Sequence, residues 1–262
     1  MKLNKLILRG FNILACATGA LFLFTGVLLA YDLQEYLPLA EGNTWVYRMK
    51  NGENGVETND QEINKVKGTE KIGEVETVKV ISNKTISKCI AIDDEGVKLY
   101  KYWGWSGGEY EVCNPPKMLF PNIGLGESRA YPIKSAQSNI DDVVAEGTME
   151  EGTLTITLDS VEDVETPIGK FKDCLKFSSV YEFKKVNRPE SGKETMTIWL
   201  APGVGKVKSD EAFSEYNAET KKEAKSTELL ILEDATINGN KVSIEKESPA
   251  TETPPQVQEG QS

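Results

Sequence analysis

The 262-residue sequence contains no histidine. Without an imidazole, the chain cannot build Ser-His-Asp or Cys-His catalysis, a His-ligated zinc or copper site, or a His-ligated haem. The remaining catalytic routes are carboxylate pairs, a Ser-Lys dyad and metals with oxygen ligands. The absence of one residue type therefore removes every histidine-dependent catalytic or metal-binding arrangement.

Acidic residues do cluster, at Asp93-Asp94-Glu95 and at Asp141-Asp142. Neither cluster has the D-x-[DN]-x-[DN]-G spacing of a calcium-binding loop, and a chain this acidic produces such clusters by chance. We expect solvated turns, and we predict no catalytic residue, no metal site and no cofactor. The alternative is a histidine-independent, carboxylate-based hydrolase that uses Asp93 or Asp141.

Cysteine is scarce, and only Cys89, Cys113 and Cys174 follow the first 30 residues. An odd number of thiols in an oxidising compartment leaves at least one of them without a disulfide. A Cys89–Cys113 disulfide is compatible with the sequence, but spacing alone does not determine the pairing. No CxxC redox motif or pair of zinc-ligand cysteines occurs.

Basic residues are outnumbered, 30 against 41 acidic ones, and the net charge is −11. Residues 1–30 hold three of the basic residues and none of the acidic ones, so the rest of the chain is more acidic still. An acidic surface repels nucleic acids and anionic lipid headgroups. We predict no nucleic-acid partner, and contact with a membrane only through residues 11–30.

The N-terminus has the pattern of an export signal, because Lys2, Lys5 and Arg9 precede an uncharged, apolar run at residues 13–30. The run is longer than the core of a typical cleaved signal and close to the minimum length of a membrane span. Leu28 would occupy the −3 position of a cleavage site after Ala30, where small residues are preferred. A cleaved signal peptide and a retained N-terminal anchor both stay open, and both predict a periplasmic or cell-envelope protein.

The other end of the chain, KESPATETPPQVQEGQS from Lys246, has Val257 as its single bulky apolar residue. It cannot bury enough surface to offset the entropy of ordering it. We therefore divide the chain into a signal or anchor at residues 1–30, a β domain at residues 31–245, and a disordered acidic, proline-rich tail at residues 246–262.

Alternating hydrophobicity dominates the middle region. TLTITLD places Leu154, Ile156 and Leu158 on one face, and LKFSSVYEFK does the same with its apolar residues. Less regular strands are expected at residues 44–49, 74–82, 85–92, 97–103, 194–200 and 227–232. Asn238-Gly239 predicts a tight hairpin turn. Only residues 211–225 have weak helical periodicity, so the predicted fold is a mainly antiparallel β domain.

The stretch IWLAPGVGKVKS, residues 198–209, has glycines and a lysine but fits no phosphate-binding motif. A P-loop requires glycine at position 200 and a hydroxyl at 207, where Leu200 and Val207 stand. A type II turn fits better, because Pro202 presets its φ and Gly203 accepts a positive φ. We also expect Gly205 to permit a β-bulge.

This stretch resembles the W-x-A-P-G-V-G-x-V-K turn of a widespread, uncharacterised group of exported bacterial β-proteins and lipoproteins. Residues 36–47 are similar to that group's opening Y-x-P-L-x-x-G-N-x-W-x-Y strand, and residues 166–175 to its P-x-G-x-F-x-x-C turn and strand. The resemblance implies an antiparallel sheet curled into an open or half barrel, akin to envelope lipoprotein carriers, and no catalytic residues. Cys16 follows too little of the apolar run to be a credible lipobox cysteine, so a lipid anchor does not carry over.

An aromatic cluster surrounds Gly107-Gly108 in LYKYWGWSGGEYEV. One interpretation is a platform for a sugar ring, a peptide or a lipid chain. The other is a hairpin whose aromatic residues only pack, which is the commoner role. We assign a hypothetical ligand site to Tyr102, Trp103, Trp105 and Tyr110, and expect Trp45 and Trp199 to be core residues.

The sequence therefore predicts a non-catalytic, exported envelope protein with a binding or scaffolding role. An apolar ligand inside the curved sheet fits this prediction. The envelope ligand or protein partner is not identified by the sequence.

Overall fold

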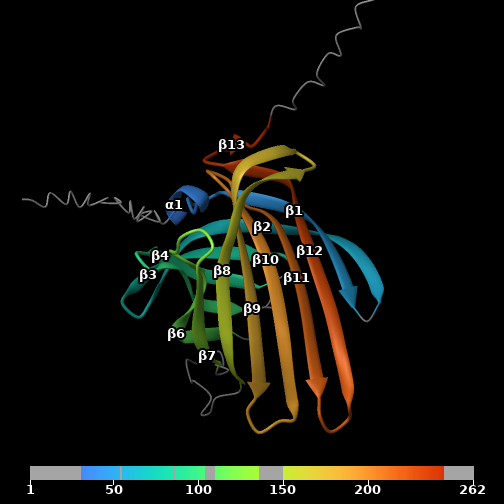
Figure 1. Ribbon diagram of the computed structural model, residues 1–262. Helices are drawn as coiled ribbons and strands as arrows, with labels where there is room; N and C mark the ends of the chain where they lie inside the picture. The colour runs from blue at the N-terminus through green and yellow to red at the C-terminus, as the bar shows by residue number, and fades with distance from the viewer. Residues whose placement is uncertain (1–30, 54, 85, 104–109, 136–149, 245–262) are drawn as a thin grey trace, which may run out of the picture.

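The computed structural model describes residues 31–53, 55–84, 86–103, 110–135 and 150–244 (Figure 1). In these residues a short helix, α1 (Leu33–Tyr36), precedes one 13-stranded sheet. The strands are β1 (Thr44–Glu53), β2 (Val56–Ile72), β3 (Val75–Ser82), β4 (Ser87–Asp93), β5 (Gly96–Trp103), β6 (Tyr110–Pro121), β7 (Ser128–Ser135), β8 (Glu150–Thr166), β9 (Gly169–Lys185), β10 (Glu190–Ala201), β11 (Gly205–Asn217), β12 (Lys222–Ile237) and β13 (Asn240–Lys241).

All strand pairs are antiparallel, in the order β6-β5-β4-β3-β2-β1-β12-β11-β10-β9-β8-β7, with β13 added to β12. Both edge strands, β6 and β7, are neighbours in the chain, so the segment between them spans the remaining gap. Its Asn122 donates a backbone hydrogen bond to Glu95 O at 2.8 Å, and Gly126 donates one to Leu158 O at 2.7 Å. The sheet is therefore a nearly closed barrel, more closed than the expected open or half barrel.

The alternation patterns of the sequence are confirmed. Leu154, Ile156 and Leu158 are all buried, and so are the apolar residues predicted to share one face of β9. Trp45 and Trp199 are buried too, as expected. Asn238 and Gly239 both have positive φ, 52° and 77°, and form the predicted turn between β12 and β13.

The weak helix predicted at residues 211–225 is wrong. β11 runs through to Asn217 and pairs with β10 and β12, and β12 begins at Lys222. The Asn217 side chain accepts backbone hydrogen bonds from Glu219 and Thr220, which closes the turn between the two strands. Pairing with neighbours on both sides outweighs the weak local preference of this polar stretch for helix.

The turn predicted in residues 198–209 is confirmed. Val204 N donates to Ala201 O at 3.2 Å, and Gly203 has φ of 69°. The expected β-bulge is present two residues beyond Gly205: Leu200 pairs with Lys206, whereas the preceding Trp199 pairs with Lys208. Because of this extra residue, the alternation of inward and outward side chains along β11 is reversed beyond the bulge.

The three motifs of the resemblance meet at one end of the barrel, around α1 (Figure 1). Gly203 N donates to Glu35 O at 2.7 Å, and the Trp45 indole donates to Val204 O at 2.6 Å. On the other side of α1, the Tyr36 hydroxyl donates to Asp173 O at 3.4 Å. These hydrogen bonds hold α1 in place as a cap over this end of the barrel. The chain after α1 forms one wall of the interior.

Cys89, Cys113 and Cys174 form no disulfide with one another. Burial raises the pKa of Cys89, and it raises the pKa of Cys174 to about 12. No helix in the described residues is long and apolar enough to cross a membrane. The hydrophobic helix expected in residues 1–30 and the tail at residues 246–262 lie outside the described residues.

Candidate functional site

The interior of the barrel holds a cavity of about 500 Å³. This volume lies within the range of about 300–1,000 Å³ that small-molecule sites occupy. Side chains from the segment after α1 and from both halves of the sheet line it. The cavity is therefore part of the fold's core and does not depend on a single surface loop.

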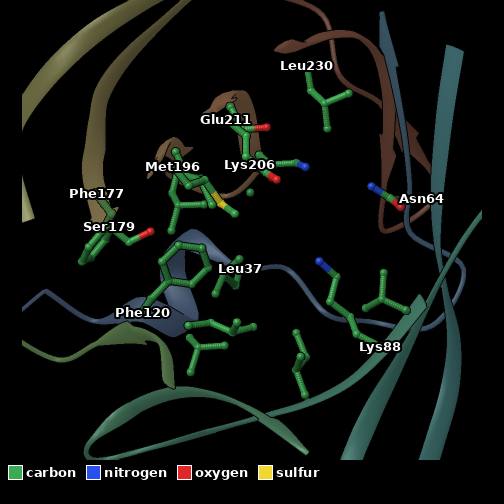
Figure 2. Close-up of a pocket in the computed structure, with 18 of the residues that line it drawn as sticks. Leu37, Asn64, Lys88, Phe120, Phe177, Ser179, Met196, Lys206, Glu211 and Leu230 are labelled. Atoms are coloured by element: carbon green, nitrogen blue, oxygen red, sulfur yellow. The ribbon is translucent and has the colours of Figure 1, made fainter. Parts of the chain in front are cut away.

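Most of the lining is apolar. Figure 2 shows Leu37, Phe120, Phe177 and Met196 grouped on one side of the cavity. Further apolar side chains come from the strands around them: Val80, Ile90, Val97, Met118, Leu154, Ile156, Ile198, Leu200 and Leu230. Such a wall favours the burial of an aliphatic chain, at roughly 25 cal/mol per Å² of apolar surface.

Charged side chains also line the cavity, which is unusual for the interior of a small barrel. They come from six different strands: Glu62, Lys88, Lys117, Glu194, Lys206, Glu211 and Glu228. Lys88 points inward because it alternates with Ile90 on β4. Lys206 points inward because the bulge in β11 places it on the same face as Ser209 and Glu211.

The positive charges of Lys88 and Lys206 are not neutralised by a carboxylate at ion-pair distance in the described residues. Burial, followed by repulsion from the Lys206 ammonium, lowers the pKa of Lys88 to about 8, against the opposing attraction of nearby carboxylates. Lys206 Nζ lies 4.8 Å from the centre of the Tyr47 ring, a cation–π contact. Among the described residues, neither lysine forms an ion pair.

The pKa values of two cavity glutamates are raised, whereas the pKa of Lys88 is lowered. Burial, with repulsion from Glu194 and Glu228, raises the pKa of Glu211 to about 7. Burial and the charge of Glu62 raise the pKa of Glu228. Because a carboxyl with a pKa near 7 is about half protonated at neutral pH, Glu211 cannot fully neutralise the lysines.

Glu62 is held by its neighbours. It is 1% exposed and accepts a hydrogen bond from Asn64 Nδ2 at 2.7 Å. Tyr47 lies opposite Glu62 in the β1–β2 register, and its hydroxyl donates to Lys206 O at 2.9 Å. These contacts fix the polar side of the cavity on the rigid strands β1, β2 and β11.

The structure describes the predicted aromatic site only in part. Tyr102 is half-buried on β5, packs against the core, and lies directly opposite Lys88 in the β4–β5 register. Trp103 is half-buried, with Lys79 Nζ 4.9 Å from its ring centre. Trp105 and the side chain of Tyr110 lie outside the described residues. The assignment of these four residues stays a prediction, and Tyr102 links it to the cavity.

The predicted carboxylate clusters are not in the cavity. Asp93 is the last residue of β4, beside the turn to β5, and forms an ion pair with Lys98 at 2.8 Å. Asp141 and Asp142 lie outside the described residues. Within the described part of the chain, no group of three or more acidic or cysteine side chains is arranged to hold a metal ion.

Sequence reasoning missed the charged side of the cavity. One usable signal was present, since Lys88 alternates with Ile90 and Ile92 in SKCIAID and so shares their face. No comparable signal existed for Lys206, because its direction depends on the bulge. Glu211 was missed because its segment was assigned to a helix.

Comparison with known proteins gives limited information. No protein-family model matches the chain, and no curated protein matches its sequence. Two solved structures align weakly. One is a candidate lipoprotein from Parabacteroides distasonis ATCC 8503, with 14% identity over 78% of this chain and all of that one, and a TM-score of 0.33. The other is a candidate exported protein with a YmcC-like fold from Bacteroides fragilis NCTC 9343, with 13% identity over 75% of this chain and 98% of that one, and a TM-score of 0.29. Alignments this weak carry no conclusion about function.

Proposed function

We propose that the protein is a non-catalytic, exported envelope protein that binds an amphipathic molecule inside its barrel. The observation that carries the proposal is the cavity of about 500 Å³, which combines a mostly apolar lining with charged side chains. A ligand with an aliphatic chain and a polar end would match both surfaces. A rigid sheet around a preformed cavity suits binding and transport, because little ordering entropy is lost when the ligand enters.

Export is proposed on the pattern of residues 1–30, either as a cleaved signal or as an anchor, followed by the β domain at 31–245 and the tail at 246–262. Cell fractionation, with sequencing of the N-terminus of the product, tests this part. Recovery of soluble protein in the cytosol with an intact N-terminus would contradict it.

A hydrolase that uses Asp93 has little support, because that carboxylate lies at the exposed end of β4, outside the cavity, and is already ion-paired with Lys98. The cavity glutamates are a different set. Their positions among apolar side chains fit the polar end of a bound molecule. Hydrolysis of long-chain esters, tested with and without Glu211→Gln, separates the two functions: turnover that the substitution abolishes would favour an enzyme.

The binding proposal is tested by filling the cavity. Ile198 lines the cavity, and Ile63 lies on the outer face of β2, 38% exposed. Ile198→Trp should abolish binding of a fluorescent fatty-acid probe, whereas the same change at Ile63 should leave binding intact. Organic extraction and mass spectrometry of the protein isolated from its own cells should identify the natural ligand. Equal probe binding by both variants would place the ligand outside the barrel.

A further inference from the structure

We infer that the cavity selects an anionic head group, a carboxylate or a phosphate monoester on an aliphatic chain, and holds it between Lys88 and Lys206. This inference rests on the proposed function, because it names the chemistry of the ligand that occupies the same cavity. It adds a preference for a negatively charged ligand and assigns that preference to Lys88 and Lys206. Binding by the apolar wall alone would require neither.

The geometry brings two ammonium groups to one place from opposite sides of the barrel. Lys88 projects from β4 and Lys206 from β11, and these strands are not neighbours in the sheet. Figure 2 shows the side-chain nitrogens of Lys88, Lys206 and Asn64 turned toward the same part of the cavity, with Leu37, Phe120, Phe177 and Met196 grouped across from them. An anion there could accept charge-assisted hydrogen bonds from two donors at once.

Many lysines elsewhere in the described residues form ion pairs. On the outer surface, Lys98 pairs with Asp93 and Glu95, and Lys101 pairs with Glu70 at 2.8 Å. In the described residues, Lys88 and Lys206 have no such partner, although both are half-buried and line the cavity. Two like charges facing one interior space cost stability, and a bound anion offsets that cost.

Among the described residues, the carboxylates of the cavity form no ion pair with Lys88 or Lys206, although Glu62, Glu211 and Glu228 each favour the charged form of Lys88. Glu62 is engaged by Asn64 at 2.7 Å. Glu211 and Glu228 face one another across β11 and β12. Burial raises the pKa of both, with added repulsion from Glu194 and Glu228 at Glu211 and from Glu62 at Glu228. A ligand anion placed beside the lysines meets two positive charges and, at Glu211, a carboxyl that is about half protonated near neutral pH.

The experiment compares head groups on one chain. A series of linear alcohols, titrated below their aggregation concentrations into the exported form of the full chain freed of detergent, first identifies the best chain length. At that length, the fatty acid, the alkyl phosphate, the alcohol and the alkyltrimethylammonium ion are compared by calorimetry. Acetate and inorganic phosphate serve as head groups without a chain.

We expect the two anionic amphiphiles to bind at least about tenfold more tightly than the alcohol, a difference of about 1.4 kcal/mol. Lys88→Gln and Lys206→Gln should each remove most of that difference and leave the alcohol's affinity unchanged. The matched control is Lys50→Gln, an exposed lysine of β1, which should change neither affinity. Acetate and inorganic phosphate should bind far more weakly than their alkylated forms.

The outcomes separate the two proposals. Equal affinity for acid and alcohol, preference for the cationic amphiphile, or insensitivity to both lysine substitutions would overturn the head-group inference while chain binding stands. Binding of free phosphate as tight as that of the alkyl phosphate would also overturn it, in favour of a simple anion site. Failure of every amphiphile to bind, the alcohol included, would overturn the proposed function itself.

A second measurement distinguishes recognition from a structural role. Lys88→Met removes an uncompensated charge from the interior, so it should raise the melting temperature of the empty protein while it abolishes the preference for anions. A lower melting temperature together with unchanged ligand preference would mean that Lys88 supports the fold only, and the inference would fail.

Discussion

Glu211 lies directly opposite Glu228 in the β11–β12 register, and both side chains line the cavity. Like charges at opposed positions of an antiparallel pair destabilise the sheet. Burial is the main cause that raises the pKa of Glu211 to about 7, and repulsion from Glu194 and Glu228 adds to it. The barrel therefore keeps an electrostatic cost in its interior, at the place where a ligand is proposed to bind.

The first prediction concerns stability and pH. Because the pKa of Glu211 is about 7 in the folded state and near 4.5 when unfolded, the folded state binds more protons between these values. Its contribution to stability is complete below about pH 4.5 and is lost as the pH rises through 7. Glu194 and Glu228 repel the ionised form, whereas Lys206 and Lys117 favour it. Glu211→Gln should therefore raise the free energy of unfolding at pH 8, by on the order of 3 kcal/mol.

Urea denaturation at pH 5, 7 and 8 measures this effect. The difference between Glu211→Gln and the wild type should grow with pH. Glu57→Gln, on the exposed part of β2, is the matched control and should show no such trend. A difference that is the same at pH 5 and pH 8 would contradict the prediction.

The second prediction concerns the cap. Trp45 is 6% exposed and its indole donates to Val204 O at 2.6 Å, which joins β1 to the turn that α1 covers. Trp45→Phe leaves the carbonyl of the half-buried Val204 without its donor and should cost about 1–3 kcal/mol. Trp199→Phe is the comparison, because its indole bonds to Glu162 Oε1 at 2.7 Å and Glu162 is open to water, which can replace the donor. If urea denaturation shows that Trp45→Phe and Trp199→Phe lower the free energy of unfolding equally, the hydrogen bond to Val204 contributes nothing specific.

The third prediction concerns the turn at residues 201–204. Gly203 has φ of 69°, and a Cβ added there would meet no atom within 4 Å, so only the backbone conformation opposes substitution. Gly203→Val should cost about 1–3 kcal/mol, because a β-branched residue is strained at positive φ. Gly203→Asn should cost less, since asparagine tolerates this region. If thermal denaturation ranks the two variants equally, the strain argument is wrong.

The sequence predicted the strands whose pattern depends on local alternation. β8 and much of β9 are examples, since their inward residues repeat every second position and are buried as expected. Polar strands gave no such alternation of polar and apolar residues. Examples are the exposed first half of β2 and the segment of β11 after Ser209, which form strands because neighbouring strands pair with them. The prolines of β6 likewise hid that strand, because proline is disfavoured within strands.

The cavity could not be predicted in the same way. Closure of the barrel depends on hydrogen bonds from the segment between β6 and β7 to Glu95 and Leu158, which are distant in the sequence. The inward direction of Lys206 depends on one extra residue in β11, and a shift of one residue moves a side chain to the opposite face. A charged residue in a strand is normally placed outside, so the sequence offered no reason to put this lysine in the interior.

The last prediction returns to the aromatic residues around position 105. If they form a binding surface, Trp103→Ala should weaken ligand binding and lower the free energy of unfolding by less than the about 3–5 kcal/mol typical of a packed aromatic side chain. The half-burial of Trp103 and its contact with Lys79 at 4.9 Å agree with a loss below that range. Tyr102→Ala should also weaken binding in the cavity, because Tyr102 lies opposite Lys88, whereas Tyr102→Phe should largely retain it. Acrylamide quenching of tryptophan fluorescence, compared between the wild type and single Trp103→Phe and Trp105→Phe variants, reports how far each indole is exposed. A blue-shifted, quencher-protected contribution from both indoles, with full-sized stability losses on truncation, would assign them to packing and end the binding-surface hypothesis.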